Sequence, residues 1–327
     1  MPVQHALVVG GGITGSVTAV ALARRGVRVH LIERSPRWFG VGHGITVHGN
    51  ALRGLAEIGL ADRVIAQGVP FDRIRVHHAD GSLLSDVPTP KTGGGDLPAT
   101  LGTLRADLQQ VLVQEIRALD VRVSLGMTAE RLEQRPDGVD VTFSDGTTGS
   151  YDLVVGADGI RSSTRAALDL PQQPAPSGMG IWRFVTERLP HMDSSAVFYG
   201  GPCYKAGYAP ISPTRCYAYV LIDPLAKPDG GLEGLRALLT DYHGDFDHLR
   251  RRIDEGTFAN YQPVEWLLVD DLWACGRVVL IGDAVHACPP LIAQGAAMCI
   301  EDAVLLAEYV TAPGLLEEQL YRFWERR

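Results

Sequence analysis

Continuous apolar runs and segments with helical spacing alternate along the chain. The continuous apolar runs lie at 6–9, 153–155 and 278–281, and the mostly apolar segment 27–32 is interrupted by Arg28 and His30. A strand buried on both faces has this pattern, which is typical of a parallel sheet. Apolar residues with helical spacing follow the first run at Val17, Val20 and Ala21, and they recur over 105–119 and 295–310. The alternation predicts an α/β fold built on a parallel sheet.

A different pattern covers 71–87 and 179–261. The first segment alternates around Asp80-Gly81, which is the signature of a hairpin. A second hairpin is expected over 132–142. Aromatic and β-branched residues dominate 179–261, which predicts an antiparallel sheet, and one or two helices over 232–253 are expected to cover it. Asn50 is expected to be the N-cap of a helix that ends at Gly59.

These patterns predict two domains that are discontinuous in sequence. Segments 1–70, 98–175 and 270–327 are expected to form a nucleotide-binding domain around the parallel sheet. Segments 71–97 and 176–269 are expected to form a substrate-binding domain around the antiparallel sheet. The ligand is then expected at the carboxyl ends of the parallel strands.

Composition excludes several classes of protein. The 327 residues carry a net charge of −8 and no basic run, which argues against nucleic-acid binding. No apolar stretch reaches the roughly 18 residues of a membrane span, and a strand that starts by Ala6 leaves no room for a signal peptide. The five cysteines lack CxxC spacing. They are expected to be buried free thiols of a cytoplasmic protein, with neither a disulfide nor a metal site.

The strongest local signal is a glycine motif after the first apolar run. Gly10, Gly12 and Gly15 form GxGxxG between an expected strand and an expected helix, and the next strand ends in Glu33. This unit binds the pyrophosphate of a dinucleotide at the helix N-terminus, and the acid accepts ribose hydroxyls. A glycine turn in an ordinary α/β sheet would leave Glu33 unexplained. An acid here also disfavours a 2′-phosphate, so FAD or NAD is expected rather than NADP.

Two further stretches stand with the glycine motif, namely 152–165 (DLVVGADGIRSSTR) and 276–303 (GRVVLIGDAVHACPPLIAQGAAMCIEDA). In this order the three resemble the FAD-dependent aromatic hydroxylases, the single-component flavoprotein monooxygenases typified by para-hydroxybenzoate hydroxylase and salicylate hydroxylase. The segments 42–45 and 105–108 also match the patterns of that family. The resemblance implies a glutathione-reductase-like FAD fold, Rossmann-like, with an inserted antiparallel β-sheet domain for the substrate.

The resemblance also implies a set of FAD-binding residues. Glu33 would hold the adenosine ribose, Arg105 would lie near the pyrophosphate, and Asp283 would accept a ribityl hydroxyl. A helix from Gly295 would point its N-terminus at flavin N1 and the C2 carbonyl. The full expected set is Gly10, Gly12, Thr14, Gly15, Glu33, Arg34, Gly44, Arg105, Asp158, Asp283, Pro289, Gln294, Gly295 and Ala296.

Several of these residues carry a second interpretation. Asp158 and Asp283 each follow a buried strand, so a buried partner is expected for both carboxylates. In the family the Asp158-Gly159 element touches FAD and affects the reaction with NAD(P)H, but Asp158 could also cap the helix that begins near Arg161. Arg105 could be a solvated arginine of a first helical turn. His286 is expected to be structural.

The mechanism implied by the resemblance has three steps. NADH or NADPH reduces FAD, reduced FAD forms a C4a-hydroperoxide with O₂, and the oxygen passes to a small aromatic or heteroaromatic substrate. A second GxGxxG is absent from the sequence, which fits transient docking of the nicotinamide and leaves NADH against NADPH undecided.

A phenolic substrate would need a base or a hydrogen-bond relay. The candidates are His43, Tyr204, Tyr208 and Tyr217, although alternating tyrosines in a sheet also serve as packing. Arg183 could bind a substrate carboxylate or form a surface salt bridge.

Alternatives stay open at this point. A reductase, dehydrogenase or halogenase could use the same scaffold, and the same flavin chemistry could hydroxylate a polyketide or antibiotic or carry out a Baeyer–Villiger insertion. A non-catalytic regulatory protein that binds flavin or NAD, or a plain NAD dehydrogenase, would also carry the glycine motif. A monomer and a homodimer are equally compatible with the sequence. The chain stops within an expected helix at 321–327, as either a truncated or a short family member would.

Overall fold

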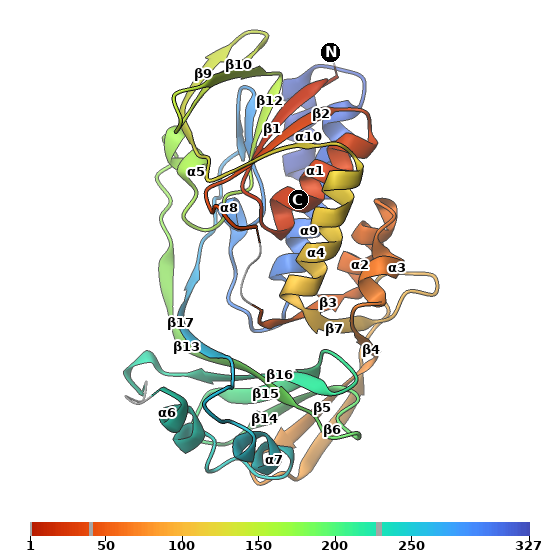
Figure 1. Ribbon diagram of the computed structural model, residues 1–327, viewed down its shortest axis with the longest axis vertical. Coiled ribbons are helices and arrows are strands. Elements are labelled where there is room, and N and C mark those ends of the chain that lie inside the picture. The colour runs from red at the N-terminus through yellow and green to blue at the C-terminus, as the bar shows by residue number, and fades with distance from the viewer. Residues whose placement is uncertain (1, 39–41, 227–230) are drawn as a thin grey trace.

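The computed structural model describes residues 2–38, 42–226 and 231–327, and its core is a six-stranded sheet in the upper half of Figure 1. The strands of this sheet are β1 (His5–Val9), β2 (Arg28–Glu33), β8 (Arg122–Leu125), β12 (Leu153–Gly156), β18 (Ala274–Cys275) and β19 (Val278–Leu280). Their order is β18-β19-β12-β1-β2-β8. Neighbouring strands are parallel except for β18 with β19. The apolar runs of the sequence therefore form the parallel sheet that their pattern predicts.

Helices and a small sheet cover the two faces of this parallel sheet. The helices of this half are α1 (Ile13–Arg24), α2 (Gly49–Glu57), α3 (Ala61–Ile65), α4 (Arg105–Ala118), α5 (Ser163–Ala167), α8 (Asp283–His286), α9 (Gly295–Thr311) and α10 (Leu316–Arg326). Val20 of α1, Leu112 of α4 and Ile300 of α9 lie in one core with Leu31 of the sheet. The small sheet of β9 (Ala129–Arg135), β10 (Gly138–Phe143) and β11 (Thr148–Tyr151) packs on the other face.

A seven-stranded sheet forms the lower half of Figure 1. Its strands are β5 (Arg73–His78), β6 (Leu83–Pro88), β13 (Ala175–Glu187), β14 (Ser195–Tyr199), β15 (Lys205–Pro210), β16 (Arg215–Ile222) and β17 (Ala259–Trp266). Their order is β17-β13-β16-β15-β14-β5-β6. All pairs are antiparallel except β14 with β5, which run parallel. The expected antiparallel sheet is thus present with one parallel pair that its sequence pattern did not predict.

Each face of the seven-stranded sheet has its own neighbour. Two helices, α6 (Gly231–Leu238) and α7 (Asp245–Arg251), cover one face through a core that includes Phe184, Phe198 and Leu235. The other face approaches the sheet of β3 (Gly44–His48), β4 (Val69–Phe71) and β7 (Thr100–Leu104). The long strands β13 and β17 run up from this sheet toward α5 and the parallel sheet (Figure 1).

Two local predictions are wrong. The N-cap of α2 is His48 rather than Asn50, which lies inside the helix. All five cysteines are free, but Cys275 and Cys288 are exposed, so the prediction of buried thiols holds only for the other three. Among the described residues, no helix is long and apolar enough to cross a membrane, and no cluster of three potential metal-ligating side chains occurs.

Candidate active site

Four sequence motifs meet at one edge of the parallel sheet. The glycine turn follows β1, Glu33 ends β2, Asp158 follows β12, and Asp283 follows β19. Backbone hydrogen bonds join these turns: Gly10 N donates to Ile32 O at 2.8 Å, and Ala157 N donates to Val9 O at 2.9 Å. Carboxyl ends of adjacent parallel strands are the ordinary place for a ligand in an α/β sheet.

The three glycines of the motif have different surroundings. Gly10 has a φ of +106°, and a Cβ there would lie 2.5 Å from Ala157 O. A Cβ on Gly15 would lie 1.8 Å from Gly10 O, so only glycine lets α1 pack against the turn. A Cβ on Gly12 would meet no atom within 4 Å. Gly12 therefore borders open space at the start of α1, where a phosphate group can approach the backbone.

The Glu33 carboxylate fixes this turn. Its Oε2 accepts a hydrogen bond from Gly11 N at 2.7 Å, and its Oε1 accepts one from Ser35 N at 2.8 Å. Each oxygen keeps a further lone pair for a ribose hydroxyl. The Gly11 carbonyl accepts hydrogen bonds from Trp38 Nε1 at 2.9 Å and from Gln109 Nε2 at 3.0 Å. The sequence did not indicate these last two residues, because they come from a loop and from α4.

Helices α1 and α9 both begin without a capping side chain. Their N-caps are Gly12, which has no side chain, and Gln294, whose side chain does not cap the helix. The first N–H groups of both helices are thus available to a ligand, and both helix dipoles present their positive ends. Such a pair of sites suits a ligand with a pyrophosphate at one end and an electron-accepting ring at the other.

The Gly282-Asp283 turn departs from expectation in one respect. Asp283 is exposed rather than buried, and its expected buried partner is the Cys299 thiol, which donates a weak hydrogen bond to Oδ1 over 3.9 Å. The buried carboxylate is Asp302 of α9, which accepts hydrogen bonds from Gly282 N at 2.8 Å and from His286 Nε2 at 2.6 Å. The sequence signal that could have identified Asp302 was an acidic residue at a position where the helical pattern predicts a buried apolar one. Asp283 is left free to accept a hydrogen bond from a ligand hydroxyl.

Asp158 binds the first turn of the helix that follows it, but it is not the N-cap. The N-cap of α5 is Ser162, whose Oγ accepts a hydrogen bond from Arg165 N at 2.9 Å. The Asp158 carboxylate accepts hydrogen bonds from Ser162 Oγ at 2.5 Å and from Thr164 N at 3.0 Å, while its contact with a cofactor stays a prediction. Arg165 of the same helix is buried and donates to Ala284 O and Ile160 O, both at 2.9 Å. Burial lowers the pKa of this guanidinium. Arg165 thereby ties α5 to α8, a role that the sequence did not reveal.

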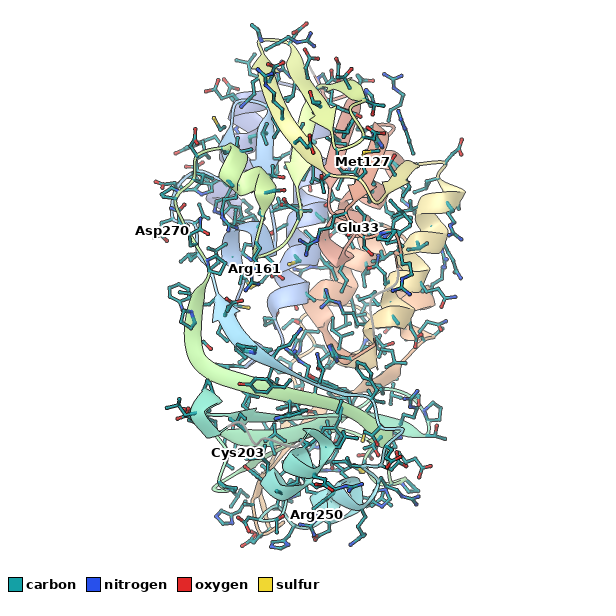
Figure 2. All side chains as sticks on the ribbon, turned by 60° about the vertical axis from the view of Figure 1, so that its left-hand side comes forward. Glu33, Met127, Arg161, Cys203, Arg250 and Asp270 are labelled. Carbon is teal, nitrogen blue, oxygen red and sulfur yellow. The ribbon has the colours of Figure 1, made fainter. Side chains whose placement is uncertain are left out.

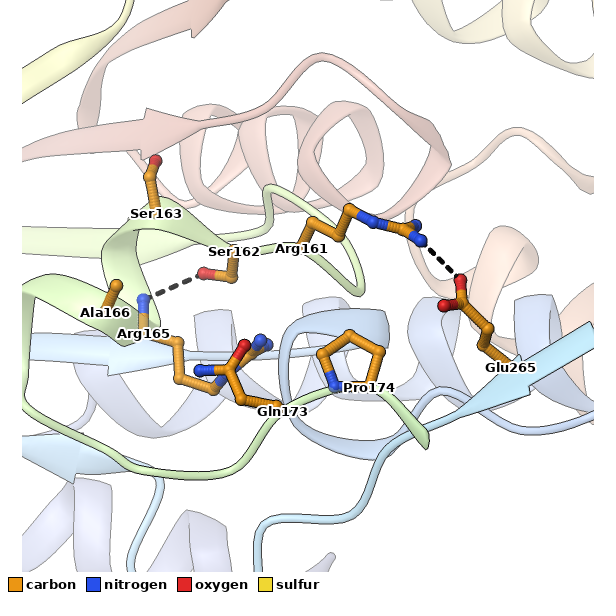
Figure 3. Close-up of a pocket in the computed structure, with 8 residues that line it drawn as sticks. All are labelled: Arg161, Ser162, Ser163, Arg165, Ala166, Gln173, Pro174 and Glu265. Carbon is orange, nitrogen blue, oxygen red and sulfur yellow. Dashed lines mark hydrogen bonds and ion pairs between the residues drawn. The ribbon is translucent and has the colours of Figure 1, made fainter. Parts of the chain in front are cut away.

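A pocket of about 500 Å³ opens beside α5. Figure 3 shows its lining, in which Arg161 reaches across to Glu265 of β17 with a nitrogen–oxygen distance of 2.7 Å. The rest of the lining comes from α5 and from Gln173 and Pro174, which directly precede β13. Figure 2 places Arg161 and Glu33 in the same half of the molecule. The pocket is polar and lies next to the Asp158 turn.

Three side chains from different elements hold the loop between α8 and α9. Lys205 Nζ of β15 donates to Leu291 O at 2.8 Å, His48 Nε2 lies 3.1 Å from Ile292 O, and Asn50 Nδ2 donates to Gln294 Oε1 at 3.3 Å. Ala293 within this loop has a φ of +55°. That conformation costs a non-glycine residue about 1 kcal/mol, so these contacts offset local strain.

His43 and Tyr217 meet where the two halves approach each other. A Cβ on Gly44 would lie 2.1 Å from Tyr217 Cβ, so the tyrosine rests directly on the backbone after His43. The imidazole of His43 packs against Phe258 with 5.5 Å between ring centroids, and its Nδ1 is buried without a partner in the described structure. Burial, helped by the charges of Arg183 and Arg105, lowers the pKa of His43 to about 4. His43 is therefore a neutral imidazole at pH 7.

The other two candidate tyrosines are not brought to this cluster. Tyr208 is buried in the core beneath α7 and donates to Asp245 Oδ2 at 2.5 Å. It faces away from His43, so its predicted catalytic role is wrong and packing explains it. Tyr204 precedes β15 with 51% of its surface exposed, and its role stays a prediction. Arg34 and Arg105 are exposed, and no side-chain hydrogen bond is recorded for either of them within the described ranges.

Comparison with known proteins agrees with this geometry. The FAD binding domain family matches residues 4–214 and 265–313. A 2-heptyl-3-hydroxy-4(1H)-quinolone synthase of Pseudomonas aeruginosa is 35% identical over 313 residues, covering 92% of this chain and 79% of the relative. The 3-amino-4-hydroxybenzoate 2-monooxygenase of Streptomyces cremeus is 33% identical over 334 residues, covering 97% and 81%. The 6-hydroxynicotinate 3-monooxygenase of Pseudomonas fluorescens is 29% identical, covering 96% and 84%.

Solved structures are similar over almost the whole chain. The structure of Klebsiella pneumoniae HpxO complexed with FAD and uric acid has a TM-score of 0.85 and 25% identity, covering 98% of this chain and 83% of that one. The tetrameric form of 2-methyl-3-hydroxypyridine-5-carboxylic acid oxygenase gives 0.84 and 25%, covering 99% and 86%. The chain therefore belongs to the family of FAD-dependent aromatic monooxygenases. It is an FAD-dependent oxidoreductase, as its four motifs indicate.

Proposed function

We propose that this protein hydroxylates a small aromatic or heteroaromatic substrate with O₂ and NADH or NADPH. The observation that carries the proposal is the joint geometry of the sheet edge. Two uncapped helix N-termini and the carboxylates of Glu33 and Asp283 converge there. The names of the relatives, which include acids of benzene and pyridine rings and a quinolone, support aromatic substrates.

The residues present fit FAD. The open space at Gly12 and the N-terminus of α1 suit the pyrophosphate, Glu33 suits the ribose, and exposed Asp283 suits a ribityl hydroxyl. The N-terminus of α9, at Gly295, would stabilise negative charge on the ring. When bound, FAD would take a hydride from the nicotinamide and pass one oxygen atom of O₂ to the substrate. We propose segments 1–70, 98–175 and 270–327 as the part that binds it.

The side chains around His43 would act on the substrate. A neutral imidazole with an unpaired Nδ1 can accept a hydrogen bond or a proton from a phenol. Burial raises the pKa of Tyr217, although the charge and hydrogen bond of Arg183 oppose that shift. Tyr217 would therefore stay a phenol and donate a hydrogen bond to the substrate. Phe258 and the aromatic ring of Tyr217 would exclude water from the reacting atoms.

The nicotinamide nucleotide would dock transiently at the pocket beside α5. The pocket is next to the turn that carries Asp158, and the guanidinium of Arg161 lines it. Arg161 is paired with Glu265, but its side chain is 66% exposed and can also meet a phosphate. This placement would bring NAD(P)H to the edge of the site rather than to a second Rossmann motif.

The experiment that tests the proposal begins with the visible spectrum of the purified protein. We expect flavin bands, and we expect NADH or NADPH oxidation to rise when the right aromatic compound is added to air-saturated buffer. Mass spectrometry should find one ¹⁸O atom from ¹⁸O₂ in the product. A protein that remains colourless and takes up no added FAD would refute the proposal. Oxidation that is never stimulated by phenols, hydroxypyridines or quinolones would favour a non-hydroxylating flavoprotein.

A further inference from the structure

Arg183 is a half-buried arginine without an acidic partner. Its Nη1 donates to Gln262 Oε1 at 2.8 Å, and no carboxylate lies within salt-bridge distance of it in the described part of the chain. The surface salt bridge, one of the two interpretations that the sequence offered for Arg183, is therefore not formed. A partly buried guanidinium with only neutral partners keeps unused N–H donors and an uncompensated charge. Such a group is a candidate for an anionic ligand.

The strand places Arg183 on the face that approaches His43. In β13, Trp182 and Phe184 point into the core beneath α6 and α7, so Arg183 between them points to the opposite face. Its register partners are Asn260 on β17 and Tyr219 on β16. Val185, the next residue on that face, pairs with Tyr217. Arg183 therefore belongs to the His43 and Tyr217 cluster and not to the surface.

The field at this cluster has the opposite sign to the whole chain. The chain carries a net charge of −8. The charges that act on His43 are nevertheless those of Arg183 and Arg105, which both disfavour its cationic form. Arg183 also opposes the rise in the pKa of Tyr217, as a nearby positive charge does. Two cations and two neutral proton-handling groups together suit a substrate that brings its own negative charge.

We propose that Arg183 binds the carboxylate of the substrate, so that this protein acts on an aromatic or heteroaromatic acid rather than on a neutral ring. The planar guanidinium matches a carboxylate with two parallel hydrogen bonds. The ring would then lie against Tyr217 and Phe258, with its hydroxyl group at His43. This inference rests on the proposed monooxygenase function and selects among the kinds of substrate that the names of the relatives span.

The test compares each acid with its amide on the FAD-loaded protein. The probes are 6-hydroxynicotinate with 6-hydroxynicotinamide, and 4-hydroxybenzoate with 4-hydroxybenzamide. Binding is read from the change in the flavin spectrum without NAD(P)H, so it does not depend on turnover. We expect at least one acid to bind more tightly than its amide by roughly 10- to 100-fold, the range of a charge-assisted hydrogen-bonded pair. Arg183→Gln should remove that preference and leave the affinity for the amide within about twofold.

Arg215→Gln is the matched control. Arg215 lies on β16, on the same face as Tyr217, but it is exposed and does not figure among the charges acting on His43. This variant should keep the preference for the acid, and Arg183→Lys, which keeps the charge without the planar fork, should keep part of it. Flavin content equal to that of the wild type establishes that each variant is folded.

Two outcomes would overturn the inference. The first is an Arg183→Gln variant that still prefers the acid. The second is a wild-type protein whose NAD(P)H oxidation is stimulated by a neutral ring such as 2-heptyl-4(1H)-quinolone and not by acids; in that case the monooxygenase function stands and the role of Arg183 fails. If no aromatic compound binds or stimulates oxidation, the proposed function itself fails and the inference falls with it.

Discussion

Nε2 of His286 lies 2.6 Å from Oδ2 of Asp302, and both side chains are buried behind the turn that carries Asp283. Burial by itself lowers the pKa of His286, but the hydrogen bond and the charge of Asp302 outweigh burial, and the pKa is raised. The same carboxylate accepts a hydrogen bond from Gly282 N at 2.8 Å. This buried pair therefore fixes the Gly282-Asp283 turn from behind.

Replacement of Asp302 by Asn should loosen that turn. The amide would place an NH₂ group among donors, leaving buried groups unpaired. We expect a loss of about 3–5 kcal/mol in the free energy of unfolding, as for one broken partner of a buried ion pair, together with weaker FAD retention. Urea unfolding and the flavin content after gel filtration measure these effects. The control is Arg53→Gln, which removes a surface pair with Glu301 of the same helix, leaves the Arg327 pair with Asp302 in place, and should cost less than about 1 kcal/mol. Equal losses in the two variants would contradict this account.

Gly44 and Gly42 offer a matched pair of substitutions around His43. Gly44→Ala would drive a Cβ to 2.1 Å from Tyr217 Cβ, a contact that only a shift of β3 or β16 can relieve. Gly42→Ala would meet its nearest atom, Ala106 Cβ, at 3.8 Å. We expect Gly44→Ala to lower the melting temperature and substrate-stimulated oxidation, and Gly42→Ala to change neither by much. Unchanged stability and activity of Gly44→Ala would mean that Tyr217 does not pack on β3.

His30 should make the protein sensitive to mild acid. It is buried between Tyr151 and Ser124, and burial, followed by the charges of Arg122 and His5, lowers its pKa to about 4. In the unfolded chain this histidine has a pKa of about 6.5. As the pH falls, the unfolded state therefore binds a proton at a higher pH than the folded state does. The stability is therefore complete above about pH 6.5 and decreases toward pH 4, by up to about 1.4 kcal/mol for each pKa unit.

Urea unfolding at pH 7 and pH 5 measures this effect. The decrease should be smaller in His30→Gln than in the wild type, although His43 contributes with the same sign because its pKa is also lowered to about 4. His78→Gln, at an exposed histidine, is the control and should keep the decrease of the wild type. An identical decrease in His30→Gln and the wild type would exclude His30 as the source.

Substitutions of Tyr217 and Tyr208 by phenylalanine should have opposite effects, the first on catalytic activity and the second on stability. Tyr217→Phe removes a phenol beside His43 and should lower turnover by roughly 10- to 100-fold, as for one group that assists proton transfer, with little effect on unfolding. Tyr208→Phe leaves Asp245 without a buried donor and should cost about 1–3 kcal/mol of stability with unchanged kinetics. Steady-state kinetics and urea unfolding of both variants make the comparison. The reverse result would return Tyr208 to the active site.

Arg161 tests the docking of the nicotinamide nucleotide. Arg161→Gln removes a positive charge from the pocket beside α5 and should raise the KM for NADH or NADPH by roughly tenfold, the effect of losing one charge-assisted contact. Flavin content and the affinity for the aromatic compound should stay the same. Arg131→Gln, at an arginine on β9 that is 71% exposed, is the control. A KM that does not change would place the nucleotide elsewhere.

Local patterns determined much of this protein. The apolar runs predicted the strands of the parallel sheet, since a strand buried on both faces must be apolar throughout. The GxGxxG and Glu33 predicted the nucleotide site, because backbone geometry forces glycine at Gly10 and Gly15. The position of Asp158 after a buried strand predicted a partner for its carboxylate, which it finds in the first turn of α5, although the N-cap there is Ser162.

The tertiary structure alone decided which side chains meet. Strand order brings the turns after β1, β2, β12 and β19 to one edge, and no local pattern encodes that order. The sequence could not distinguish Tyr208 from Tyr217, because alternation in a strand says that two faces exist but not which face meets which neighbour. Arg183, Asp302 and Lys205 gained their roles only from partners distant in sequence. Sequence fixes backbone preferences within a few residues, whereas long-range contacts depend on how whole elements pack.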